Sequence, residues 1–251
     1  NPIEHYGLSV GQLQIGDPAD FILVEDLTTW TVDKTYIDGE LVAEGGKSLI
    51  DSVPTPAINY FQCQPKQPSD FVLSEDDAET IAIEAVDGSL FTNSVTVNPA
   101  HDSDLATMVV VNRYADAPVA KCFVRGFGIE RGAIASSVGH DSHNVLAVGV
   151  GEFELCSTVN QVIKNRGGIA VGLNDRQLVL PLPVAGIMTT ADGDTVASNY
   201  KQIDQMAKAK LGITLSAPFM TLSFLALLVI PSLKLSDRGL FDVEAFHFVN
   251  S

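Results

Sequence analysis

Two apolar runs, residues 133–138 and 145–150, stand on either side of a short polar cluster near the middle of the chain. Both runs are rich in β-branched and small apolar residues, which predicts two buried strands joined by a polar loop. The cluster between them holds His140, Asp141, Ser142, His143 and Asn144. A strand, a polar tip and a second strand must bring these five side chains together at one end of a sheet.

A loop held by a sheet can carry chemistry, because the scaffold is rigid while the loop still reaches solvent or a neighbouring pocket. An imidazole beside a carboxylate can have its tautomer fixed and its pKa moved across neutrality, which suits proton transfer or metal ligation. The candidate catalytic residues are therefore His140, Asp141, His143 and Asn144. Asp141 and Asn144 are explained equally well as turn residues that hydrogen-bond the backbone, so the local sequence leaves both interpretations open.

The composition limits the class of protein. The chain has 251 residues, enough for two modest domains, and a formal net charge of −16, which makes nucleic acid an unexpected partner. The cysteines, Cys63, Cys122 and Cys156, fit no C-x-x-C spacing, which indicates a reducing compartment and no structural zinc. The first residues lack the basic start and apolar core of a signal peptide, so we expect a cytoplasmic protein. The missing initiator Met favours a fragment of a longer chain.

Residues 211–233 carry no charge and form the segment most easily mistaken for a membrane span. Pro218 and Pro231 leave an uninterrupted run at residues 219–230, which as a helix would extend about 18 Å at about 1.5 Å per residue. A bilayer core is about 30 Å thick, so we predict a buried helix and no membrane partner. Such a helix also favours a homo-oligomer, although a helix that is apolar all round can equally lie within the core.

Turn and proline patterns divide the chain into two predicted domains. In the first, a short buried strand precedes a β-hairpin that turns at Asp38-Gly39, where Gly tolerates the positive φ of a type I′ turn. Residues 52–69 contain four prolines and follow neither a helical nor a strand period, so they are expected to be a connector, with an acidic stretch after it. The predicted domains are residues 1–75, which are β-rich, and residues 76–251.

The second domain is predicted to be a mixed sheet with helices packed on it. Residues 152–166 are amphipathic, with acidic residues at the start, basic residues at the end and two glycines afterwards, which predicts a helix. Strands on both sides of this helix give a βαβ crossover, and a second helix is expected at residues 194–211. The fold class is therefore α+β, a small β-rich segment followed by a mixed-sheet α/β domain. The other predicted strands are residues 80–86, 90–97, 108–112, 119–126, 169–173 and 177–182.

Several motifs of this sequence are similar to those of a known family. Gly16-Asp-Pro-Ala-Asp-Phe resembles the segment that follows the catalytic barrel in the amidohydrolase superfamily, where the early strands belong to a small accessory β domain. Further motifs are more specific, and with them nearly the whole chain resembles the C-terminal part of the adenine deaminase family. These motifs are Arg125-Gly-Phe-Gly, Gly132-Ala-Ile-Ala-Ser-Ser-Val, His140-Asp-Ser-His-Asn, Leu180-Pro-Leu-Pro-Val-Ala-Gly-Ile-Met and Pro218-Phe-Met-Thr-Leu-Ser-Phe-Leu-Ala-Leu.

The resemblance implies hydrolytic deamination of adenine to hypoxanthine and ammonia, a reaction of purine salvage, by a hydroxide that a divalent metal activates. It implies manganese or iron, or else zinc, as the cofactor. In the superfamily the metal ligands, including a His-x-His pair, come from a TIM barrel, whereas no two of the five histidines here stand one residue apart. We therefore expect the catalytic barrel to be absent from this chain, which alone would bind no metal and be inactive.

The resemblance also implies roles for the polar residues. The cluster from His140 to Asn144 is expected to face the mouth of the barrel and to contribute to the active site without ligating the metal, and Ser136 and Ser137 are predicted to bind substrate. The expected partners are adenine, the N-terminal barrel portion and further copies of the chain. Two alternatives stay open: a non-catalytic structural or oligomerisation module, and part of another amidohydrolase that acts on a cyclic amidine.

Overall fold

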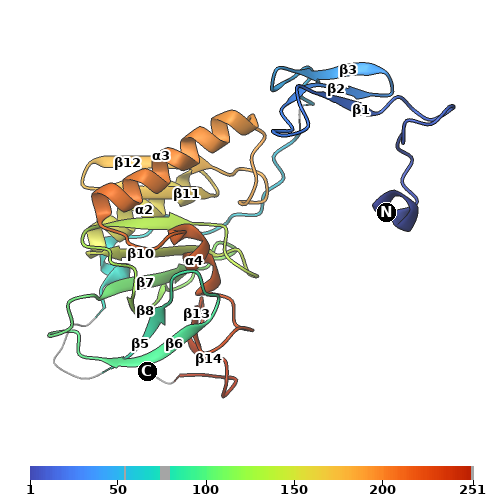
Figure 1. Cartoon of the computed structure of the whole chain (residues 1–251). Helices are drawn as coiled ribbons and strands as arrows, with labels where there is room; N and C mark the ends of the chain where they lie inside the picture. Colours follow the sequence, from blue (N-terminus) through green and yellow to red (C-terminus); the bar gives the residue numbers. More distant parts are fainter. Residues whose placement is uncertain (54, 74–79, 250–251) are drawn as a thin grey trace. The chain divides into compact units, whose positions relative to one another are not determined.

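The computed structural model describes residues 1–53, 55–73 and 80–249 of the chain. The chain forms two compact units, Asn1–Thr55 and Pro56–Ser251 (Figure 1). A four-stranded sheet forms the first unit, and an eight-stranded sheet with helices on it forms most of the second. The predicted fold class, a small β-rich segment followed by a mixed α/β domain, is confirmed.

The two units divide between Thr55 and Pro56, whereas the prolines and the acidic stretch predicted a domain boundary near residue 75. The difference arises because Phe61 of the expected connector, and Phe71 just after it, are buried in the core of the second unit. The backbone N–H of Lys66 also donates to an Asn160 side chain of that unit, at 2.9 Å. The acidic stretch that guided the expected boundary falls outside the described residues.

The first unit is a small antiparallel sheet with one short helix. Its elements are α1 (Pro2–Tyr6), β1 (Phe21–Val24), β2 (Val32–Ile37), β3 (Glu40–Glu44) and β4 (Lys47–Ser48), with the strands paired in chain order. Asp38 and Gly39 form the predicted hairpin turn, and their φ angles of 54° and 82° are both positive, as a type I′ turn requires. None of residues 1–53 is fully buried, and Trp30 is 61% exposed. The sheet therefore has no interior of its own.

The second unit is built on a mixed eight-stranded sheet. Its strands are β5 (Thr80–Ala85), β6 (Thr92–Val97), β7 (Ala106–Val111), β8 (Ala120–Arg125), β9 (Gly132–Ser136), β10 (Val145–Val150), β11 (Gly168–Leu173) and β12 (Arg176–Pro181). They lie in the order β12-β11-β9-β10-β7-β8-β5-β6. β5 pairs with β8 in parallel and the other neighbouring pairs are antiparallel, so the predicted mixed sheet is confirmed.

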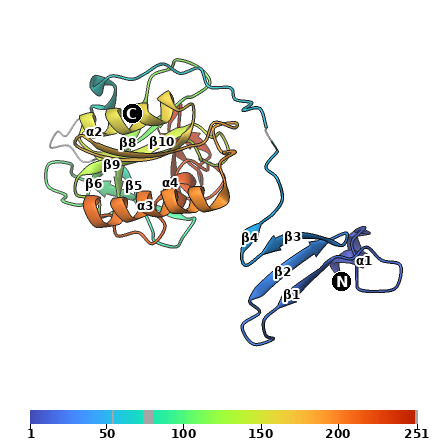
Figure 2. The ribbon, with the colours of Figure 1, turned by 90° about the horizontal axis from the view of Figure 1, so that it is seen from above.

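Helices cover both faces of this sheet (Figure 2). α2 (Glu152–Lys164) lies on one face, and α3 (Gly193–Leu211) and α4 (Pro218–Phe224) lie on the other. Successive side chains of a strand point to opposite faces, and in β7 Val109 packs in the α2 layer while Met108 packs in the α3 layer. Burial on both faces explains why these strands read as continuous apolar runs.

α2 connects β10 to β11, and both of these strands pair antiparallel with β9, which lies between them. β10 and β11 therefore run parallel to each other, and the predicted βαβ crossover is present with one strand inserted. Leu155, Val159 and Val162 of α2 are buried, as the amphipathic pattern predicted. β9 and β10 are the third and fourth strands of the sheet order, so the loop that joins them lies at the ends of central strands.

The apolar run at residues 219–230 is helical only at its beginning. α4 ends at Phe224, so the expected helix through residue 230 is wrong. The carbonyl of Leu225 accepts the N–H of Leu235 at 3.0 Å. This bond ties the end of α4 to the strand that follows it in the chain. That strand belongs to a short three-stranded sheet that the sequence did not predict, composed of β13 (Leu233–Ser236), β14 (Gly239–Asp242) and β15 (His247–Phe248).

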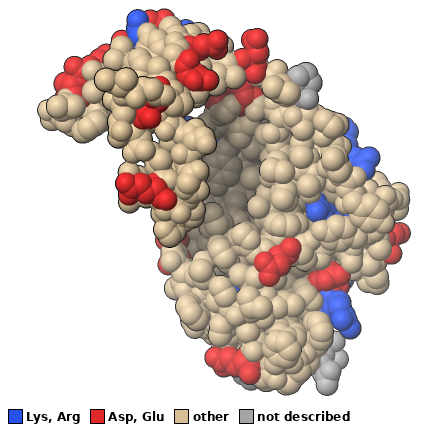
Figure 3. Space-filling view, turned by 90° about the vertical axis from the view of Figure 1, so that its right-hand side faces the viewer, with Lys and Arg blue, Asp and Glu red and all other residues tan. Residues whose placement is uncertain are grey.

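The described residues also bear on the two expectations about surfaces. Across the described ranges, no helix has both the length and the apolarity needed to cross a membrane. Aspartate and glutamate outnumber lysine and arginine by 31 to 15 in the whole chain, and carboxylates are scattered over the face shown in Figure 3. A negative surface repels the phosphates of nucleic acids.

Candidate functional site

The polar cluster between β9 and β10, residues 139–144 and called the tip below, lies at one end of the eight-stranded sheet. β9 and β10 pair antiparallel, with Ser136 opposite Leu146, which confirms the predicted order of strand, tip and strand. The backbone N–H of His143 donates to the carbonyl of Gly139 at 2.8 Å and closes the turn. β7 is antiparallel to β10, so the residues that follow β7 lie beside the tip.

Segments that are distant in sequence meet at this end of the sheet. The N–H of Ala185, in the loop after β12, donates to the carbonyl of Ile58 at 2.6 Å, and the N–H of Gln62 donates to the carbonyl of Arg113 at 2.7 Å. Residues 58–62 precede the sheet, whereas Arg113 follows β7. Four segments therefore lie together at this end of the sheet: the tip, the chain before β5, the residues that follow β7 and the loop after β12.

The structure brings three of the four predicted catalytic residues together at the surface. The ring of His140 lies against Phe224 of α4, with centroids 4.6 Å apart, while Asp141 is exposed and His143 is partly buried. Asn144 faces inward instead: it is 3% exposed, and its Oδ1 accepts the backbone N–H of Arg113 at 3.3 Å. Asn144 thus fastens the tip to the exit of β7.

His143 is the tip residue whose protonation the surroundings change. Burial lowers its pKa below the ordinary value, and the nearby charges of Arg113 and His140 lower it further, while Asp141 opposes them. Its Nδ1 is buried and has no hydrogen-bond partner among the described residues. The surroundings therefore favour the neutral imidazole, which can accept a proton or a hydrogen bond.

Ser136 and Ser137, the predicted substrate-binding residues, are both fully buried. The Oγ of Ser136 accepts the N–H of Val138 at 3.0 Å. The Oγ of Ser137 accepts the N–H of Gly168 at 2.8 Å and donates to the carbonyl of Gly186 at 2.5 Å. These bonds hold β11 and the loop after β12 against β9, and substrate contact by either serine stays a prediction.

Arg113, which no sequence motif indicated, makes several polar contacts close to the tip. It is 6% exposed; its Nη1 donates to the carbonyl of Ala185 at 2.6 Å and its Nη2 to the hydroxyl of Tyr114 at 3.0 Å. That hydroxyl donates in turn to the carbonyl of Ser142 at 2.7 Å. The partners Asn144 and Ala185 lie 31 and 72 residues away in the sequence, so local spacing gives no indication of these contacts. The one available signal was that a charged residue follows directly after an apolar strand.

The described residues do not fit the metal that the resemblance implies. Among them, no group of three or more His, Cys, Asp or Glu side chains is placed to hold a metal ion. Cys63, Cys122 and Cys156 are free and buried. Burial raises the pKa of Cys63 to about 11 and also raises that of Cys122, whereas the thiolate is the form that binds metals. No metal-dependent step is therefore assigned to these residues.

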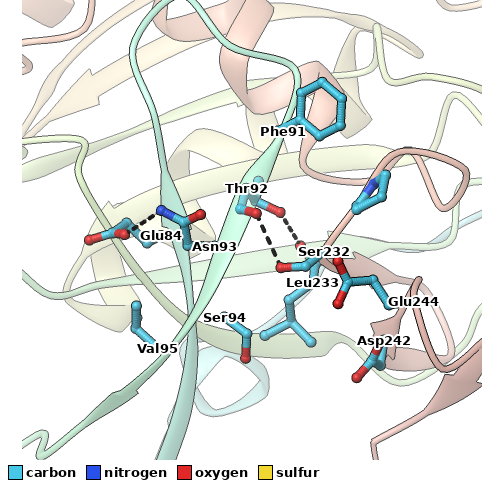
Figure 4. Close-up of a pocket in the computed structure, with 11 residues that line it drawn as sticks. Glu84, Phe91, Thr92, Asn93, Ser94, Val95, Ser232, Leu233, Asp242 and Glu244 are labelled. Atoms are coloured by element: carbon cyan, nitrogen blue, oxygen red, sulfur yellow. Dashed lines mark hydrogen bonds between the residues drawn. The ribbon is translucent and has the colours of Figure 1, made fainter.

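A separate hollow of about 670 Å³ lies where β6 meets the short C-terminal sheet (Figure 4). The hydroxyl of Thr92 donates to the carbonyl of Leu233 at 2.8 Å, which fastens β13 to the edge strand. Glu84 already accepts hydrogen bonds from Arg125 and Asn93. No predicted site residue is in its lining, which consists of Glu84, Phe91, Thr92, Asn93, Ser94, Val95, Pro231, Ser232, Leu233, Asp242 and Glu244.

This α/β domain, which carries a polar loop at the end of a mixed sheet, is similar to a known family. Residues 81–247 match the family model described as the adenine deaminase C-terminal domain. The chain belongs to the adenine deaminase family. This confirms the resemblance inferred from the motifs.

Curated relatives match the chain along its whole length. An adenine deaminase of Sulfurovum sp. (strain NBC37-1) is 51% identical over 253 residues, which cover 100% of this chain and 47% of that protein. The adenine deaminase of Salinibacter ruber is 48% identical, with 100% and 48% covered, and that of Borreliella burgdorferi is 40% identical, with 100% and 47% covered. The chain thus spans about half the length of the curated relatives it matches.

Proposed function

We propose that this chain is the C-terminal portion of an adenine deaminase, a hydrolase that converts adenine to hypoxanthine and ammonia. The supporting observation is that identity of 38–51% to proteins named adenine deaminase extends over the whole chain or nearly all of it, including the small sheet outside the family match. Those proteins are about twice as long, which supports an N-terminal portion that carries the catalytic barrel.

The chemistry proposed for the tip concerns protons and hydrogen bonds. A divalent metal, manganese or iron or else zinc, would activate the attacking hydroxide on the N-terminal portion. Adenine has ring nitrogens that accept hydrogen bonds and an amino group that must leave protonated. His140 and His143, with Asp141 beside them, would donate to the ring or carry a proton to the leaving group. Asn144 would act indirectly, because its amide oxygen is already bonded to Arg113.

Ammonia release from adenine, with Mn²⁺ or Fe²⁺ added, tests the proposed reaction. We expect no turnover by the 251-residue chain alone, and turnover by the full-length protein or by this chain mixed with the N-terminal portion. Turnover by the chain alone would contradict the placement of the chemistry on the other portion. Full-length activity only on another cyclic amidine would identify a different amidohydrolase, and no activity in any combination would favour a non-catalytic module.

Two substitutions test the role of the tip in the full-length protein. His140→Ala and His143→Ala should each lower kcat/KM for adenine at least about tenfold, or roughly 1.4 kcal/mol of transition-state stabilisation. His247→Ala is the matched control, because His247 is exposed on β15. Metal content and melting temperature should stay unchanged. Unaltered kinetics in both tip variants, or activity lost only in step with stability, would show that the tip is structural.

Self-association and a cytoplasmic location remain predictions. The apolar run that motivated the homo-oligomer packs inward at Phe219 and Leu222, which are both buried. Its exposed members are Met220 and Val229, which are 56% and 70% exposed. The structure thus accounts for most of this apolar run by burial within the unit.

A further inference from the structure

Arg113 is a buried cation for which the described residues supply no carboxylate. The ion pairs in that part of the chain involve other residues, and the Nε of Arg113 has no hydrogen-bond partner there. Burying a guanidinium without a counter-charge is costly. A net gain in stability therefore does not account for this residue, and its contacts indicate another role.

Those contacts converge on the tip from two directions. The backbone N–H of Arg113 donates to Asn144 at the end of the tip, and its Nη2 reaches Ser142 through the hydroxyl of Tyr114. The guanidinium carbon lies 4.8 Å from the centre of the Tyr114 ring, so the cation also rests on the face of that ring. Residue 113 thus holds Asn144 through its backbone, which any residue would supply, and Ser142 through its guanidinium.

The same guanidinium joins the tip to the loop after β12. Its Nη1 donates to the carbonyl of Ala185, and the next residue is Gly186, at φ +72°. A Cβ on Gly186 would collide with the Nη1 of Arg113, so only glycine leaves room for this contact. The carbonyl of Gly186 is fixed by the hydroxyl of Ser137, which anchors the guanidinium to the end of β9.

We propose that Arg113 is a positioning residue, which sets the orientation of the tip and of His143 for deamination without touching the substrate. The proposal rests on the proposed function for its kinetic consequence, but its structural part concerns this chain alone. The planar fork of the guanidinium is essential to it, since one side chain must donate to Ala185 and Tyr114 at fixed angles. A lysine supplies the charge but not the fork.

The charge of Arg113 has a separate effect on the same histidine. The groups that face His143 are Arg113, His140 and Asp141, and Arg113 is the larger of the two charged neighbours that lower the pKa of His143. Arg113→Met should therefore raise that pKa, because the cation is removed. Arg113→Lys should leave it close to the wild-type value. The two variants separate the effect of the charge from that of the fork.

NMR on the 251-residue chain tests the structural part. We expect titration of the His143 ring to show a raised pKa in Arg113→Met only, and the tip amides to exchange faster with solvent in both Arg113 variants and in Tyr114→Phe. Arg131→Met is the control, because Arg131 is 61% exposed and pairs with Glu130. Unchanged exchange of the tip amides in Arg113→Lys would overturn the proposal that the fork positions the tip, and an unchanged His143 pKa in Arg113→Met would refute the effect of the charge.

Kinetics of the full-length protein test the consequence for the reaction. Arg113→Lys and Arg113→Met should each lower kcat for adenine at least about tenfold with a smaller change in KM, because the tip is misplaced while the substrate pocket remains. Wild-type kcat in Arg113→Lys would refute positioning by the fork. A wild-type protein that does not deaminate adenine would refute the proposed function instead, and the NMR measurements would still decide whether Arg113 orients the tip.

Discussion

At the scale of single residues, Lys234 is a lysine enclosed within the protein. It lies on β13, is fully buried, and its Nζ donates to the carbonyl of Leu90 at 3.0 Å. Burial lowers its pKa to about 8, because the charged form loses its hydration. The folded protein therefore binds fewer protons than the unfolded chain between about pH 8 and the ordinary lysine pKa of 10.5.

This difference predicts how stability depends on pH. Stability rises with pH wherever the unfolded state binds more protons, so the free energy of unfolding should increase from about pH 8 to 10.5 by roughly 3 kcal/mol for this group. In Lys234→Met that increment should be missing, whereas Lys201→Met, an exposed lysine on α3, should retain it. Urea denaturation at pH 7 and pH 10 gives the comparison. Equal pH dependence in wild type and Lys234→Met would contradict the assignment.

The local sequence predicted the conformation of residues whose structure depends on their immediate neighbours. Asp38 and Gly39 form the expected turn because positive φ at both positions is a property of the dipeptide itself. The roles of Arg113 and Lys234 depend on carbonyls of Ala185 and Leu90, which are 72 and 144 residues away. The inward orientation of Asn144 has the same cause, since its partner belongs to β7's exit. Side-chain partners across a sheet are not encoded in local spacing.

At the scale of elements, periodicity predicted the long helices and most strands. α3 begins at a cap, where the Asp192 side chain accepts the N–H of Thr195, and ends at Gly212 with φ 85°, and both features could be read from the sequence. The end of α4 could not, because Leu225 leaves the helix to bond with Leu235. The short C-terminal strands were missed for a related reason: two to four residues carry too little pattern.

Two residues of α4 test whether this helix serves the core or a surface. Leu222 is fully buried, whereas Met220 is 56% exposed. Leu222→Ala should lower the free energy of unfolding by about 2–5 kcal/mol, through lost burial and a cavity, while Met220→Ala should change it by less than about 0.5 kcal/mol. Chemical denaturation followed by circular dichroism measures both. A larger loss in Met220→Ala, particularly one that depends on protein concentration, would point to an interface instead.

At the scale of the whole molecule, the unit that folds is longer than the unit that the family model matches. The match begins at residue 81, but Phe61, Cys63 and Phe71 complete the core beneath α2. A chain that begins at Pro56 should therefore unfold cooperatively, whereas one that begins at residue 81 should lose roughly 5 kcal/mol from these side chains or fail to fold. Equal denaturation midpoints for the two chains would show that the segment before residue 81 contributes no stability.

The exposed indole of Trp30 in the first unit also limits the use of tryptophan fluorescence in the unfolding experiments. Trp30 is the single tryptophan of the chain. It lies in the loop between β1 and β2 of the first unit, outside the unit that carries Lys234, Leu222 and the tip. Tryptophan emission therefore reports on a side chain already in water, and unfolding of the eight-stranded sheet would leave no direct record in it. A tryptophan introduced at Phe127, which is 1% exposed in the core of the second unit, would place an optical reporter where the stability of that unit is determined.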